Sequence, residues 1–134
     1  MKKIIPLSLI ALTAGCMAEA PPPERSRFVE SRLAEELRGR VVSGPSVSCV
    51  SMRDLRGNRS VGEGVILFDG PGSTIYVNRP RAGCPVINSG RALRTRTTST
   101  RLCEGDIATV FDPVSGIEYG GCGLGPFTPY RRLR

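Results

Sequence analysis

Apolar residues at four-residue steps predict one short helix near the start of the chain. Val29, Leu33 and Leu37 recur at this spacing and place a narrow apolar stripe on a helix over residues 24–39. A proline just before this segment and the glycine at its end suit the two boundaries of a helix. The opposite face mixes Glu with Arg, which favours packing of the stripe against protein rather than against lipid.

Further along the chain, short runs of apolar or alternating residues predict β-strands. The predicted strands cover residues 61–68, 73–78, 91–98, 106–111 and 116–121. Asp69-Gly70-Pro71-Gly72 supplies a turn that makes the first two runs a hairpin. Residues 40–48, rich in Ser, Gly and Val, are predicted to be a linker before a β domain over 49–130. The predicted fold class is therefore mostly β, a small antiparallel barrel or sandwich of about five short strands, preceded by one short helix.

The first fifteen residues combine a basic start, an apolar stretch and a small-residue end. Lys2 and Lys3 precede apolar residues 4–12, and Thr13-Ala14-Gly15 lead to Cys16. As a helix, the twelve residues 4–15 span about 18 Å, whereas a hydrocarbon core is roughly 30 Å thick, so no membrane-spanning helix is predicted. The order of segments resembles the signal of a bacterial lipoprotein, in which the cysteine is lipidated and becomes the first residue of the mature chain.

This resemblance implies that residues 1–15 are removed and that Cys16 carries acyl chains, which together hold a protein stably to a bilayer. Residues 16–23 contain three consecutive prolines and are predicted to form an extended tether with a reach of about 25 Å. Met17, in place of Asp, implies passage to the outer membrane of a Gram-negative bacterium, facing the periplasm. Plain secretion remains open, with cleavage after Ala18-Glu19-Ala20, although Pro21 directly follows that site.

Positive charge in the predicted mature chain resides on arginine alone. The formal net charge of the whole chain is +7, and Lys2 and Lys3 are its only lysines. Arginine suits anionic partners such as phosphate headgroups, lipopolysaccharide or acidic glycans. We identify no dense basic run as a binding face, which favours solvated charges. Nucleic acid is not predicted as a partner, because Arg is not interleaved with aromatic residues, of which there are four Phe, three Tyr and no Trp.

Four further cysteines predict two disulfides. Cys49, Cys84, Cys103 and Cys122 form no C-x-x-C motif, and the chain has no His, so neither a zinc site nor a redox pair is predicted. In an exported protein an even number of cysteines is typical of a disulfide frame. Three pairings are possible. We favour Cys49–Cys122, which ties the start of the domain to its end, with Cys84–Cys103 inside it.

Several short segments between residues 49 and 127 carry a second resemblance. They are residues 49–55, 64–68, 76–78 with 83–85, 101–103 with 106–107, and 121–127. The most specific piece is the four-cysteine frame with its Cys-Gly-Leu-Gly ending at residues 122–125. Together they resemble a family of small exported proteins of Gram-negative bacteria that is a domain of unknown function. The resemblance implies one compact disulfide-bonded domain, and it implies no activity.

Catalytic groups are scarce in this sequence. Without His, and without Lys beyond residue 3, the chain lacks Ser–His, Cys–His and Ser–Lys pairs. Glu104 and Asp106 could act as acid and base in glycoside hydrolysis, but residues two apart in a turn more often form the turn itself. Arg94, Arg96 and Arg101, with the threonines between them, could form an anion-binding strand face. The alternative is a solvent-facing strand whose Arg stems cover apolar surface.

We therefore expect a lipid-anchored, periplasm-facing protein whose β domain is a non-enzymatic binding or envelope-associated module. Its expected partners are the membrane, through acyl chains on Cys16, and an envelope protein or anionic envelope polymer. No cofactor, metal or catalytic residue is predicted. An inhibitor of a cell-wall-degrading enzyme is one variant, by analogy with lipoprotein inhibitors of lysozyme. The alternative is a small carboxylate-dependent hydrolase that uses Glu104 and Asp106 on an envelope polymer.

Overall fold

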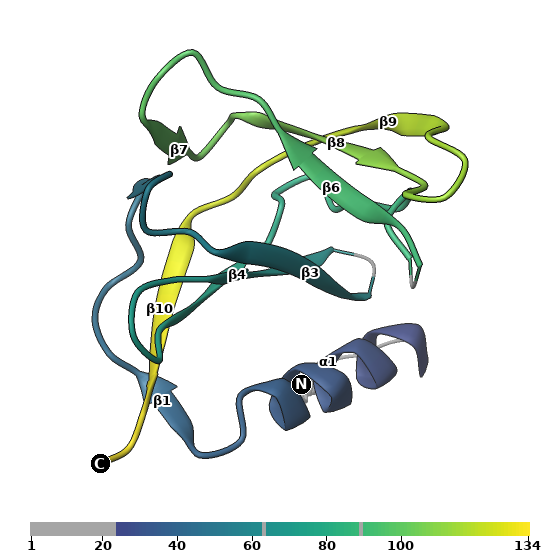
Figure 1. Cartoon of the computed structure of the whole chain (residues 1–134). Helices are drawn as coiled ribbons and strands as arrows, with labels where there is room; N and C mark the ends of the chain where they lie inside the picture. The colour runs from purple at the N-terminus through teal and green to yellow at the C-terminus, as the bar shows by residue number, and fades with distance from the viewer. Residues whose placement is uncertain (1–23, 63, 89) are drawn as a thin grey trace, which may run out of the picture.

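The computed structural model describes residues 24–62, 64–88 and 90–134 (Figure 1). This part of the chain contains one helix and ten strands, so the prediction of a mostly β fold with one short helix is confirmed. The elements are α1 (Glu24–Glu36), β1 (Arg40–Val42), β2 (Cys49–Ser51), β3 (Gly57–Gly62), β4 (Val65–Asp69), β5 (Ile75–Asn78), β6 (Ala92–Thr95), β7 (Arg101–Cys103), β8 (Ile107–Phe111), β9 (Glu118–Gly123) and β10 (Phe127–Arg132).

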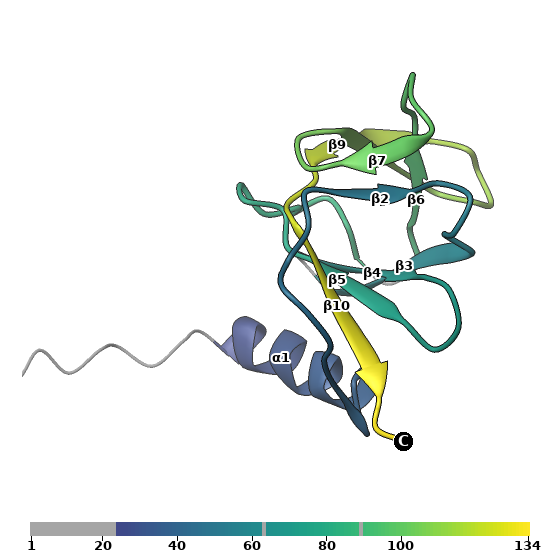
Figure 2. The same cartoon turned by 90° about the vertical axis from the view of Figure 1, so that its left-hand side faces the viewer.

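The strands form three antiparallel sheets. The largest has five strands in the order β1-β10-β5-β4-β3, and the others are the three-stranded sheet β6-β8-β9 and the two-stranded sheet β2-β7. In Figures 1 and 2, α1 lies on one side of the five-stranded sheet and the two small sheets lie on the other. The sheets are not closed into a barrel, so of the two predicted architectures the sandwich is the one that fits.

Strand β4 is apolar along its length because both of its faces are covered. Side chains alternate between the two faces of a strand. Val65 and Leu67 pack on one face in the cluster that includes α1, whereas Ile66 and Phe68 pack on the other face with the small sheets. A strand covered on both faces has an apolar run rather than an alternating pattern. This explains the unbroken apolar run at residues 65–68 within the predicted strand 61–68.

The five-stranded sheet therefore separates two hydrophobic clusters, which we call the helix side and the cysteine side. The helix side consists of Val29, Leu33, Val61, Val65, Leu67, Ile75 and Val77. The cysteine side consists of Val50, Ile66, Phe68, Cys84, Ile87, Leu93, Leu102, Ala108, Val110, Cys122, Leu124 and Phe127. On the helix side the predicted apolar stripe of α1 supplies Val29 and Leu33, both buried.

Two predicted segments have a different structure, whereas other predicted ends are shifted by a few residues, such as that of α1, which ends at Glu36. The predicted strand 61–68 is instead a β3–β4 hairpin, because the chain turns between Gly62 and Gly64, whose φ angles of 146° and 82° lie in a region that favours glycine. The predicted linker 40–48 begins with β1, which pairs with β10 at the edge of the sheet. Val47 in the same segment also bridges to Phe127 at the start of β10.

Candidate functional site

The predicted anchoring segment lies outside the described residues. It comprises the signal peptide over 1–15, Cys16 and the tether over 16–23. Within the described part of the chain, α1 is the first element, and no helix there is long and apolar enough to cross a membrane. Lipidation of Cys16 therefore stays a prediction from the sequence.

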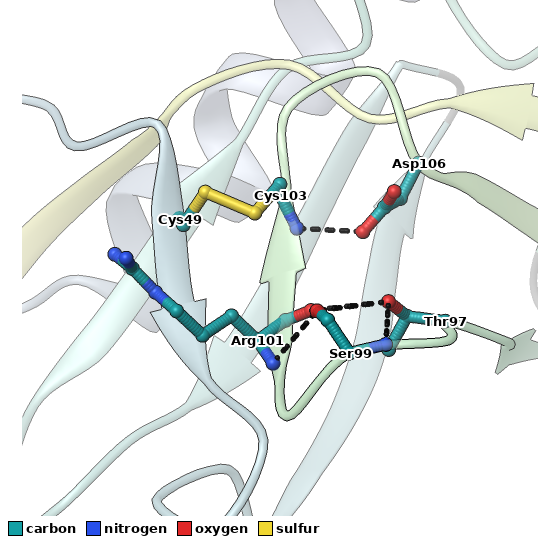
Figure 3. Close-up of a disulfide and its surroundings, with 6 residues drawn as sticks. All are labelled: Cys49, Thr97, Ser99, Arg101, Cys103 and Asp106. Atoms are coloured by element: carbon teal, nitrogen blue, oxygen red, sulfur yellow. Dashed lines mark hydrogen bonds between the residues drawn. A yellow bond between two sulfur atoms is a disulfide. The ribbon is translucent and has the colours of Figure 1, made fainter.

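The four remaining cysteines form two disulfides, Cys49–Cys103 and Cys84–Cys122. Two disulfides are thus confirmed, but the favoured pairing of Cys49 with Cys122 and Cys84 with Cys103 is wrong. Strand register explains the first bond, because Cys49 on β2 lies directly opposite Cys103 on β7, with a Cα–Cα distance of 4.0 Å (Figure 3). Cys122 lies on β9, and it is buried with Cys84 in the cysteine side.

The two carboxylates considered as a catalytic pair have separate structural partners. The Nε–H of Arg81 donates to Oε1 of Glu104 at 2.7 Å. Asp106 accepts the backbone N–H of Cys103 on Oδ2 at 2.8 Å, as Figure 3 shows, and its own N–H donates to the Cys103 carbonyl. Asp106 thus closes the turn between β7 and β8. Across the residues that the structure describes, no group of three or more His, Cys, Asp or Glu could hold a metal ion.

The predicted anion-binding arginines lie on three different segments. Arg94 is on β6, Arg96 follows that strand in a loop, and Arg101 is the first residue of β7 in another sheet. Nη1 of Arg94 is 3.3 Å from Oε1 of Glu118, and its guanidinium carbon is 4.6 Å from the centre of the Phe111 ring. Strand β6 ends at Thr95, so Arg96 and Arg101 do not lie on the same strand face as Arg94. Anion binding by them stays a prediction.

A different group of arginines gathers where β1, β10 and the β4–β5 loop meet. Here a hollow of about 460 Å³ opens at the surface. Its lining residues are Pro71, Gly72, Ser73, Thr74, Arg131, Arg132 and Arg134. We call these residues, together with Arg40 beside them, the arginine hollow. The hollow lies at the end of β10, close to the C-terminus. Figures 1 and 2 show this end of β10 near β1 and near the end of α1 that leads into β1.

Strand register and two hydrogen bonds position the side chains of the arginine hollow. Arg40 on β1 is directly opposite Arg132 on β10, so the two side chains share one face of the sheet. Nη1 of Arg40 also donates to the carbonyl of Ser73 in the β4–β5 loop. Arg131, which precedes Arg132 on β10, donates from Nε to Oγ1 of Thr74 at 3.1 Å.

The arginine hollow differs from the rest of the surface in its charge pairing. Five other arginines form ion pairs with carboxylates, namely Arg38, Arg59, Arg79, Arg81 and Arg94. Among the described residues, no carboxylate side chain forms an ion pair with any of the four arginines of the hollow. Like charges directly opposite on neighbouring strands destabilise a sheet. The hollow therefore concentrates positive charge that the described part of the protein does not neutralise.

Sequence reasoning missed this site for an identifiable reason. The signal is present as Arg131-Arg132-Leu133-Arg134, three arginines within four residues, although no dense basic run was identified. The run becomes a site through Arg40, which lies in the segment interpreted as a linker and reaches β10 through the pairing of β1. Because this contact joins residues far apart along the chain, neither the composition nor the local spacing of residues predicts it.

No family model, curated protein or solved structure matches this chain. The resemblance of residues 49–127 to a domain of unknown function therefore stays a prediction, as does the resemblance of the first sixteen residues to a lipoprotein signal. A function for the protein has to follow from its own residues and their geometry.

Proposed function

We propose that the protein is an exported lipoprotein, anchored to the outer membrane by acyl chains on Cys16, and that its β domain is a non-enzymatic binding module facing the periplasm. The pair of disulfides carries this proposal. Disulfides form and persist in exported proteins, whereas the cytosol keeps thiols reduced. The basic, apolar and small-residue segments before Cys16 supply both a route of export and a site of attachment.

Two observations support binding rather than catalysis as the role of the domain. Glu104 and Asp106, the carboxylates that could act as acid and base, are engaged by Arg81 and by the backbone of Cys103. The arginine hollow, in contrast, presents cations that pair with no carboxylate side chain in the described residues. Such a surface attracts anionic groups, which matches the expected class of partner, an envelope polymer or protein carrying negative charge.

The anchor is tested by substituting Cys16 in cells that make the full chain. Cys16→Ser should abolish incorporation of radiolabelled palmitate and move the protein from the membrane fraction to the soluble periplasmic fraction, because a chain without acyl groups has no bilayer attachment. Met17→Ala is the matched control, since it leaves the cysteine in place, and it should keep both label and membrane fractionation. Membrane retention of the Cys16→Ser protein would overturn the proposed anchor.

The non-enzymatic role is tested separately, with purified protein and cell-wall material as substrate. We expect no release of soluble fragments by the unsubstituted protein. Fragment release that Glu104→Gln and Asp106→Asn abolish, and that Glu118→Gln preserves, would show the hydrolase instead. Glu118 is a suitable control because it also pairs with an arginine, Arg94, but lies on β9.

A further inference from the structure

We infer that the arginine hollow binds a phosphate group, carried either by a lipid headgroup or by a soluble phosphate ester. The inference names the ligand class of the binding module and rests on the proposed function above. The proposed phosphate contacts depend on the residues at the meeting point of β1, β10 and the β4–β5 loop, and only the approach to a membrane uses the predicted tether and anchor.

The side chains of the hollow supply the positive charge and the N–H donors that a phosphate group requires. Each guanidinium offers a planar fork of N–H donors that fits two oxygens of a phosphate group. Arg131, Arg132 and Arg134 line one hollow, and Arg40 lies opposite Arg132 across the β1·β10 ladder. A bound anion would offset the repulsion between these two facing cations. The unliganded arrangement is electrostatically unfavourable, so an anionic ligand gains more here than beside an arginine that already has a carboxylate partner.

The loop at the floor of the hollow adds uncharged donors. Residues 71–74 form a tight turn in which Thr74 N–H donates to the Pro71 carbonyl, and Gly72 has a φ of 60°. The backbone N–H groups of Gly72 and Ser73 and the Ser73 hydroxyl donate to no group within the described residues. Successive N–H groups in such turns form anion-binding concavities in other proteins. Among the described residues that line the hollow, none is acidic, so none opposes an anion there.

The size and position of the hollow are compatible with a phosphate on a membrane lipid. A volume of about 460 Å³ lies in the range of small-molecule sites and leaves room for a group attached to the phosphate. Figure 2 shows the end of β10, whose arginines line the hollow, near the end of α1 that leads into β1, and a helix of 13 residues is about 20 Å long. The predicted tether of residues 16–23 reaches about 25 Å, so the hollow can meet the surface of the membrane to which Cys16 is anchored.

Binding is measured with the full chain carrying Cys16→Ser, so that acyl chains do not contribute. The probes are phosphatidylcholine vesicles containing phosphatidic acid, vesicles whose negative charge comes from a fatty-acid carboxylate, and inorganic phosphate in solution. The test variant combines Arg131→Gln, Arg132→Gln and Arg134→Gln. The matched control combines Arg53→Gln, Arg56→Gln and Arg81→Gln, which removes the same charge at three exposed positions outside the hollow. Circular dichroism verifies that both variants are folded.

We expect the test variant to bind phosphatidic acid vesicles at least about tenfold more weakly than the parent, and the control to change by less than about threefold. Saturation by inorganic phosphate with the same arginine dependence would identify the phosphate group alone as the ligand, whereas binding to vesicles only would identify a lipid headgroup. Equal loss in both variants would overturn the inference, because net charge alone would then explain binding. Equal binding of carboxylate vesicles would overturn it too. None of these results changes the outcome of the palmitate experiment on the anchor.

Discussion

The two sides of the five-stranded sheet are held together by different means. On the cysteine side, two disulfides cross-link segments of the two small sheets and the loop after β5. On the helix side, no disulfide joins the described residues, and α1 is held by apolar packing and ion pairs. A sheet of only two strands is marginally stable by itself, and so is an isolated helix of 13 residues. The protein thus stabilises the β2-β7 sheet with a covalent cross-link and α1 with packing and ion pairs.

Arg59 is the main polar link on the helix side. Its guanidinium donates to both carboxylate oxygens of Asp69 at 2.7 and 2.8 Å, and to Oε2 of Glu36 at the end of α1 at 3.0 and 3.2 Å. Partial burial alone would lower the pKa of Arg59, but the hydrogen bonds to Asp69 and Glu36 and the charges of these groups outweigh it and raise the pKa. The side chain therefore remains a cation that bridges helix and sheet.

Removal of the buried disulfide should have the largest effect on stability. Replacing both Cys84 and Cys122 with Ala opens a loop with a sequence separation of 38 residues, and we expect the free energy of unfolding to fall by about 4 kcal/mol. Urea unfolding followed by circular dichroism measures this loss. Adding a reductant to the double variant should reduce the remaining disulfide, Cys49–Cys103, and lower the free energy of unfolding further. A total fall in the free energy of unfolding below about 1 kcal/mol would contradict the conclusion that the disulfides stabilise the cysteine side.

Truncation of Leu33 tests the helix side. This residue of α1 is 5 % exposed, and Leu33→Ala should lower the free energy of unfolding by about 3 kcal/mol through lost burial and a cavity. Phe28→Ala on the same helix is the control, because Phe28 is 59 % exposed, and it should cost less than about 0.5 kcal/mol. Hydrogen exchange should show faster exchange in α1 with unchanged protection in β8. Equal acceleration in β8 would mean that the two sides unfold as one unit.

Arg59→Met should have a smaller effect on the same side. The ion pairs with Asp69 and Glu36 are about one-third exposed, so solvent screens them, and we expect a loss of about 1 kcal/mol. Arg56→Met, at an exposed position without an ion pair among the described residues, should change stability by less than about 0.5 kcal/mol. A double-mutant cycle with Glu36→Gln isolates the link to α1, and purely additive effects would contradict it.

The smallest expected effect is a pH dependence on the cysteine side. Asp112, in the β8–β9 turn, accepts the backbone N–H groups of Ser115 and Val114, and these hydrogen bonds lower its pKa below the ordinary value. Stability from this carboxylate is therefore fully present above its pKa in the unfolded chain and is lost as the pH falls through the lowered folded value. Carboxyl-carbon NMR titration measures the pKa directly. Ser115→Pro removes one donor and should move it upward, and an ordinary pKa in the unsubstituted protein would contradict the turn geometry.

Local signals in the sequence predicted local structure correctly. The four-residue spacing of Val29 and Leu33 identified the buried stripe of α1, because a helix converts that spacing into one face. The turn chemistry at residues 69–72 identified the β4–β5 hairpin, since glycine and proline determine the path of a tight turn. In each case the information lies within a few residues of the feature that it determines.

Contacts between distant segments account for the errors. The pairing of Cys49 with Cys103 follows from the register of β2 against β7, two strands of three residues that are too short to show a period. The pairing of Arg40 with Arg132 joins segments far apart along the chain and places a further arginine beside the hollow. Neither register is encoded in spacing along the chain, so the fold class was predictable and the candidate site was not.

The path of the backbone between α1 and Cys49 has a further consequence. Residues 24–48 lie outside both disulfide loops, and residues 43, 45 and 46 in this stretch are exposed. Hydrolysis of one peptide bond there would leave α1 and β1 attached by packing and hydrogen bonds alone, while the remainder of the domain stays cross-linked. A single proteolytic event could thus shed the domain from everything that precedes it. The shed form would keep Arg132 but lose Arg40 once the cut segment diffuses away.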